Sequence, residues 1–168
     1  AAIYGNAAAY GAQIAAEGRD YVTSIDTKMV AGGQCAVVVR MAQLLEAHPE
    51  WEMPQAVEAA NDLIARARMC FIPDQLEFLR AGGRVSNAVA LVGRVLGIHP
   101  LIEIQDGNLT ATKKLRGKLL GVAPKLVADY AEREGLDREE LWLIWAPGFS
   151  DEVRSVVEES ARACGFQT

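Results

Sequence analysis

The sequence contains few cysteines and histidines, and this scarcity argues against a metal site. Its 168 residues include three cysteines, Cys35, Cys70 and Cys164, and two histidines. Zinc sites usually take closely spaced Cys or His pairs, and no CxxC pair occurs here. We therefore predict no metal ion and no cofactor, and we expect reduced thiols of the kind found in cytoplasmic proteins.

Basic charge and long apolar runs are also scarce. The chain has 17 Lys and Arg against 22 Asp and Glu, a formal net charge of -5 and a sequence pI of about 5.1. It therefore lacks the global basic field with which proteins neutralise nucleic-acid phosphates. No apolar run approaches the ~20 residues that cross a bilayer, and residues 1–9 lack the basic flank of a signal peptide. We predict a cytoplasmic protein that does not bind nucleic acid.

Several catalytic motifs are missing as well. The sequence has no GxSxG elbow, no GxxxxGK[ST] phosphate loop, no GxGxxG loop and no HExxH helix. Catalytic groups can still assemble from distant positions, so these absences alone do not decide the question. We predict no catalytic residue.

The chain does have an ordinary globular composition, with 51% hydrophobic and 23% charged residues. Such a chain can bury enough apolar surface to fold. Its first part predicts a helix over residues 6–16, a short strand over 21–25 and a well-buried helix over 35–47. This order is typical of an α/β layer with a parallel sheet.

The prolines at residues 48–54 predict a domain boundary. We expect the remnant of a first α/β domain over residues 1–50, and a second α/β domain with a mixed or antiparallel sheet over 54–168. In the second part the strongest local signal is Asp106-Gly107, a hairpin turn. The other predicted elements are a helix from Pro54, a strand over 69–72, a helical turn over 75–80, an apolar helix over 87–96, strands over 98–104 and 109–112, a helix to about 133, a strand over 141–145 and a helix capped by Ser150.

The loop Gly82-Gly83-Arg84 is the most informative local feature. Two glycines permit positive φ angles, and Ser86 suits the start of the helix that follows. Amide groups at a helix start favour an anion, and Arg84 could add a bidentate bond to a carboxylate. The simpler interpretation is that the glycines end one helix, Ser86 caps the next and the arginine is solvated.

Two neighbouring features also allow two interpretations each. The helix over residues 87–96 alternates small and medium apolar residues, which suits a core helix or, beside an anion loop, a groove for an amphiphilic acid. The basic stretch that contains Lys114 and Arg116 suits an acidic partner surface, or is a solvated face.

Four motifs in order carry a resemblance to a known family. They are VTSIDT at residues 22–27, FIPDQLEFLRAGGRV at 71–85, LGIHPLI at 96–102, and QDG at 105–107 followed by KLRG at 114–117. Together they resemble the DegV family over nearly the whole chain. The resemblance implies a two-domain α/β protein that binds a long-chain fatty acid and has no activity of its own. In several members it serves as the binding subunit of bacterial fatty acid kinase, and a separate ATP-dependent subunit phosphorylates the carboxylate.

The resemblance also implies site residues. The head group would lie near Arg84, Gly83 and Ser86. The acyl chain would lie along Phe78, Ala88, Leu91, Val92 and Ile98. The kinase subunit would dock at Lys114 and Arg116, and a transient contact with a membrane surface is compatible with such a carrier.

The chain departs from the family's pattern near both ends. The family's hydroxyl-bearing stretch, which resembles SGTYxSA, is matched only by its tail, with Ala1 and Ile3 at hydroxyl positions. Its last strand and its HTGPG-like loop would follow Thr168. We therefore expect an internal fragment without much of the head-group site. Two alternatives stay open: an enzyme acting on a small phosphorylated or carboxylated substrate at the Gly-Gly-Arg loop, and a scaffold.

Overall fold

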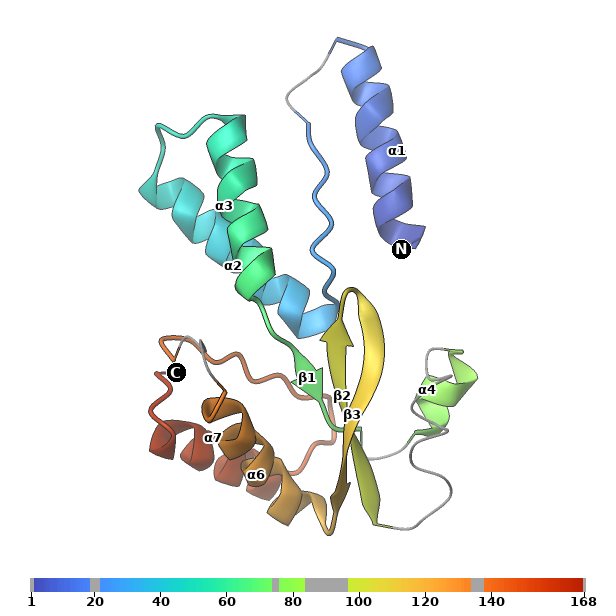
Figure 1. Cartoon of the computed structure of the whole chain (residues 1–168), viewed down its shortest axis with the longest axis vertical. Helices are drawn as coiled ribbons and strands as arrows, with labels where there is room; N and C mark the ends of the chain where they lie inside the picture. The colour runs from blue at the N-terminus through green and yellow to red at the C-terminus, as the bar shows by residue number, and fades with distance from the viewer. Residues whose placement is uncertain (1, 19–21, 74–75, 84–96, 134–137, 168) are drawn as a thin grey trace. The chain divides into compact units, whose positions relative to one another are not determined.

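The computed structural model describes residues 2–18, 22–73, 76–83, 97–133 and 138–167, and Figure 1 traces the chain. Contacts group the chain into two compact units. The first unit contains Ala1–Met69 and Ile104–Asn108, and the second contains Cys70–Glu103 and Leu109–Thr168.

The first unit begins with α1 (Ala2–Ala16), as the helical stretch at its start predicted. Gly18 ends this helix with a φ of 78°, a conformation that glycine adopts without a steric penalty. The strand predicted over residues 21–25 is wrong as a strand, because residues 22–30 carry no strand assignment. A strand requires a neighbour that completes its hydrogen-bond ladder, and the described residues contain only one sheet, made of three other segments.

The helices α2 (Ala31–Ala47) and α3 (Met53–Arg66) complete the first unit and pack on each other. As predicted, Pro54 lies in the first turn of α3, and a capping box between Glu52 and Gln55 starts this helix. The expectation that α2 is well buried is wrong. Only Val37 is buried, whereas Val38 and Leu45 are 56% and 45% exposed. These two side chains are seven residues apart and share a helix face.

The turn at residues 48–52 connects two helices of the same unit. The units defined by contacts divide at Met69 instead. The domain division at residues 50–54 stays a prediction, because the grouping of contacts into units does not test it.

The second unit is built around a sheet of order β1-β2-β3 (Figure 1). β1 (Cys70–Phe71) pairs antiparallel with β2 (Ile98–Gln105), with Cys70 opposite Glu103 and Phe71 opposite Ile102. β3 (Asn108–Arg116) follows β2 through the two-residue turn Asp106-Gly107. Both turn residues have positive φ angles, 49° and 76°, as a type I′ hairpin requires, so the predicted hairpin is confirmed.

The described part of the second unit also contains helices. The short α4 (Glu77–Ala81) agrees with the predicted helical turn. The helix predicted over residues 87–96 lies outside the described residues. The helices α6 (Leu119–Ala131) and α7 (Asp151–Ala163) pack along each other, and the hydroxyl of Ser150 caps α7 by accepting a hydrogen bond from the Val153 amide at 3.4 Å.

The strand predicted over residues 141–145 is also wrong as a strand, although its alternation is real. Leu141, Leu143 and Trp145 pack on the core formed by α6 and α7. Trp142 and Ile144 point outward and are 41% and 59% exposed. Within the described ranges no neighbouring segment forms a ladder with these residues, so the pattern yields an extended segment.

Candidate functional site

The predicted head-group loop is described only in part. Gly83 follows α4, is exposed and has a φ of 66°. Arg84 and Ser86 lie outside the described residues, as do the predicted acyl-chain residues Ala88, Leu91 and Val92. Phe78 belongs to α4. The structure therefore does not test this part of the predicted site.

The remaining predicted acyl-chain residue, Ile98, is half-buried at the start of β2. Side chains alternate along a strand, so Ile98 and Ile102 share one face of β2. Ile102 is only 1% exposed. It packs against apolar side chains of β1, the α4 region and β3, namely Phe71, Leu76, Leu79, Leu109 and Ala111. This face of β2 is therefore apolar and meets the segment that leads to Gly83.

The opposite face of β2 carries a buried charge that sequence reasoning missed. Glu103 is 7% exposed, and its Oε1 accepts hydrogen bonds from Arg133 Nη2 at 2.6 Å and from the Tyr130 hydroxyl at 3.1 Å. The Arg133 guanidinium also lies 3.9 Å from the centre of the Tyr130 ring. A lone acidic residue inside an apolar strand was the available signal, since buried carboxylates need partners.

Two groups next to this carboxylate have shifted pKa values. Burial raises the pKa of the Cys70 thiol from 9.0 to about 11. Burial also raises the pKa of the Tyr130 hydroxyl, and the nearby Cys70 contributes to that rise. Both groups therefore stay protonated at neutral pH. The cluster of Cys70, Glu103, Tyr130 and Arg133 has one negative charge and one positive charge.

A second polar group of β2 is buried without a partner. His99 is 9% exposed, and within the described part of the chain its Nδ1 atom has no hydrogen bond. An unsatisfied buried polar atom is unfavourable by about 1–3 kcal/mol.

The predicted docking residues lie on β3 and are exposed. Lys114 and Arg116 have no ion pair with any described residue. Their neighbour Lys113 differs, because its Nζ lies 2.6 Å from Oδ2 of Asp129 on α6. The structure thus distinguishes a paired lysine from two cations that form no ion pair with the described residues.

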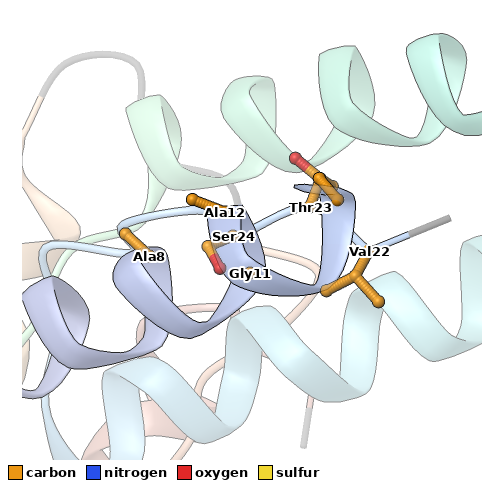
Figure 2. A pocket seen from close by; sticks show the side chains of 7 residues that line it. Ala8, Gly11, Ala12, Val22, Thr23 and Ser24 are labelled. Carbon is orange, nitrogen blue, oxygen red and sulfur yellow. The ribbon is translucent and has the colours of Figure 1, made fainter. Parts of the chain in front are cut away.

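A groove of about 240 Å³ in the first unit was not predicted from the sequence. Figure 2 shows it between α1 and the extended segment at residues 22–24. A Cβ atom at Gly11 would lie 3.1 Å from the Ser24 hydroxyl oxygen, which donates to the Ala7 carbonyl at 3.2 Å. The small residues of α1 at spacings of three and four were the signal for this close approach. The groove is lined by Ala8, Gly11, Ala12, Ala15, Val22, Thr23 and Ser24.

The described residues lack two further kinds of feature, a metal-binding cluster and a membrane-spanning helix. They contain no group of three His, Cys, Asp or Glu side chains that could hold a metal ion. None of the described helices is long and apolar enough to cross a membrane.

Comparison with known proteins connects the chain to one family. The model of the DegV family, which is described as uncharacterised, matches residues 3–168. A DegV domain-containing protein of Deinococcus radiodurans is 36% identical over 111 residues, which are 66% of this chain and 37% of that protein.

Solved structures agree with this match. A DegV family protein of Thermus thermophilus is described by its fatty acid binding. It is 28% identical to this chain with a TM-score of 0.58, and the match covers 70% of this chain and 42% of the Thermus thermophilus chain. The fatty acid kinase B3 protein of Streptococcus pneumoniae was solved loaded with linoleic acid. It is 19% identical to this chain with a TM-score of 0.58, and the match covers 72% of this chain and 44% of the Streptococcus pneumoniae chain. A third solved structure, of a DegV family protein from Eubacterium eligens, has a TM-score of 0.74 over 95% of this chain.

These structures share the α/β fold of the chain. The chain spans about a third of the length of the first curated relatives that it matches. It spans about half of the solved chains.

Proposed function

Because this chain belongs to the DegV family, we propose that it forms part of a protein that binds a long-chain fatty acid and does not itself transform it. The observation that carries this proposal is the likeness to the Thermus thermophilus protein, which is described by its fatty acid binding. The apolar face of β2 supports it, since an acyl chain needs a continuous apolar wall.

In this proposal the acyl chain lies along Ile98 and the other predicted wall residues, Phe78, Ala88, Leu91 and Val92. The carboxylate binds at Gly83, Arg84 and Ser86. The exposed backbone of Gly83 has a positive φ angle, and no described atom lies within 4 Å of a Cβ placed on it, which supports room for a head group at this residue.

The direct test is to purify the longest native chain that contains these residues and to extract its lipid. Mass spectrometry should recover a long-chain acid, and a delipidated sample should bind oleic acid. A protein that neither carries nor takes up such an acid contradicts the proposal.

A matched pair of isoleucine substitutions tests the wall. Ile98→Asn places an amide in the proposed acyl path and should weaken oleic acid binding by roughly tenfold or more, because burying an unpaired amide is unfavourable by about 1–3 kcal/mol. Ile144→Asn alters an isoleucine that is 59% exposed, and it should leave the affinity unchanged. Equal effects of the two substitutions would remove Ile98 from the site.

We also propose that Lys114 and Arg116 dock an ATP-dependent fatty acid kinase subunit, which would phosphorylate the bound acid. These two exposed cations form no ion pair with the described residues, and this supports the role, since an acidic partner surface would attract them. A carrier of this kind would work in the cytoplasm, where ATP is available.

This 168-residue chain should bind oleic acid more weakly than a chain that carries the family's hydroxyl groups. Ala1 and Ile3 stand where the family resemblance implies hydroxyl groups that bind the carboxylate. A titration in which the 168-residue chain and the longest native chain bind oleic acid equally well would contradict this proposal.

A further inference from the structure

The two faces of β2 carry different chemistry at adjacent residues. Ile102 packs against the side chains of Phe71 and Leu79 on the face proposed for the fatty acid. Glu103, the next residue, is bound by Tyr130 and Arg133 on the other face. All of these residues belong to the second unit.

The contacts of Glu103 fix α6 to the sheet. Tyr130 lies in the last turn of α6 and Arg133 follows its end, and both donate to the same carboxylate oxygen at 3.1 and 2.6 Å. Hydrogen bonds that involve a charged group are directional and about twice as strong as neutral ones. They therefore hold β2 at one position along α6.

Of this ion pair Glu103 is buried, whereas the Arg133 side chain is 36% exposed. A partly buried pair is a weak source of stability but can define one arrangement of the elements it joins. Apolar side chains would hold α6 on the sheet without fixing its register, because hydrophobic contacts are not directional. The choice of a charged pair at this place calls for a role other than stability alone.

We propose that Glu103, Tyr130 and Arg133 are positioning residues for the fatty-acid site: they hold β2 in the register that gives its Ile98–Ile102 face the shape an acyl chain requires. This inference rests on the proposed function. It adds residues that contact no ligand and that act through the strand they hold.

The test compares affinity with stability in the longest native chain. Glu103→Gln and Tyr130→Phe remove the charge or one donor with little change in volume. Coupling through packed elements is worth about 0.5–2 kcal/mol, so each variant should weaken oleic acid binding by about 2- to 30-fold. The control is Val157→Ala, which opens a cavity in the core between α6 and α7. It should lower the melting temperature without changing the affinity.

Cys70 supplies a second readout, because it lies opposite Glu103 in the β1–β2 pair. If the acid and the cluster are coupled through β2, oleic acid should slow iodoacetamide alkylation of Cys70 and leave the exposed Cys35 unaffected. This measurement does not require a variant to fold.

The outcomes separate the inference from the function on which it rests. If both variants bind oleic acid with unchanged affinity, and if Cys70 is alkylated at the same rate with and without the acid, the cluster has only a structural role. The proposed function would then still stand. A wild-type chain that binds no fatty acid would overturn both.

Discussion

At the scale of single residues, Cys70 shows how burial controls reactivity. The thiolate is the form that reacts with alkylating reagents, and burial raises the pKa of this thiol to about 11. At pH 8 we therefore expect iodoacetamide to modify Cys35, which is exposed, much faster than Cys70. Mass spectrometry of a time course checks this, and equal rates at the two positions would show that Cys70 is not shielded.

The same shift gives a pH dependence with a defined sign. Because the folded state keeps Cys70 protonated up to about pH 11, while an unfolded thiol ionises near its ordinary pKa of 9.0, the contribution is complete below pH 9. Stability should fall as the pH rises from 9 to 11. A Cys70→Ala variant should lose this part of the fall in urea unfolding measured at both pH values.

His99 shows the cost of burial, since no described residue forms a hydrogen bond with its buried Nδ1 atom. Replacing both the donor and the acceptor of such a ring by apolar atoms removes the desolvation penalty. We expect His99→Leu to raise the free energy of unfolding by about 1 kcal/mol. Urea denaturation measures this, and a loss of stability would show that the imidazole has a partner in solution.

The residue scale also shows what the sequence could not reveal. Cys70, Glu103, Tyr130 and Arg133 are spread over more than sixty positions, and no local pattern brings them together. By contrast, Ser150 was predicted correctly as the cap of a helix, because its effect depends only on the adjacent backbone.

At the scale of elements, the β2–β3 hairpin depends on one glycine. Gly107 has a φ of 76°, and a Cβ there would lie 3.8 Å from the Cβ of Lys28, which is an ordinary contact. The effect of Gly107→Ala should therefore come from backbone strain, about 1–2 kcal/mol of lost stability. The matched control is Gly121→Ala in α6, where no described atom lies within 4 Å of an added Cβ.

The two alanine substitutions should have opposite signs. A helical glycine costs about 0.5–1 kcal/mol relative to alanine, so Gly121→Ala should stabilise the chain. Thermal unfolding of both variants gives the answer. If both lower the melting temperature, strain at positive φ is not what distinguishes them.

Elements that need a distant partner were the ones that sequence reasoning misjudged. The hairpin was found because Asp106-Gly107 and its flanking strands are adjacent in the chain. Residues 21–25 and 141–145 have strand composition, but composition does not supply a ladder partner. The burial of α2 was misjudged for the same reason, since the apolar content of a helix does not say what covers its apolar face.

At the scale of the whole molecule, two exposed cations contrast with a negative net charge. The chain has a net charge of -5, yet Lys114 and Arg116 stand together on one strand without counterions among the described residues. Local cations on an acidic protein can orient an encounter with an acidic surface while the overall charge opposes non-specific binding. The sequence alone favoured a solvated face over a docking surface, because it could not show that Lys113 is the paired member of the group.

This difference between neighbouring lysines makes the docking proposal testable. Replacing both Lys114 and Arg116 by Ala should slow association with the ATP-dependent kinase subunit about tenfold at low salt, because such charges mainly raise the rate of encounter. The loss should shrink in about 0.5 M salt, where charges are screened beyond a few ångströms. Lys113→Ala, which breaks only the pair with Asp129, should have little effect on association. Surface plasmon resonance of the wild-type chain and the two variants against the kinase subunit measures this, and oleic acid affinity checks that each chain is intact. If Lys113→Ala slowed association as much as the double substitution, the docking role would be refuted.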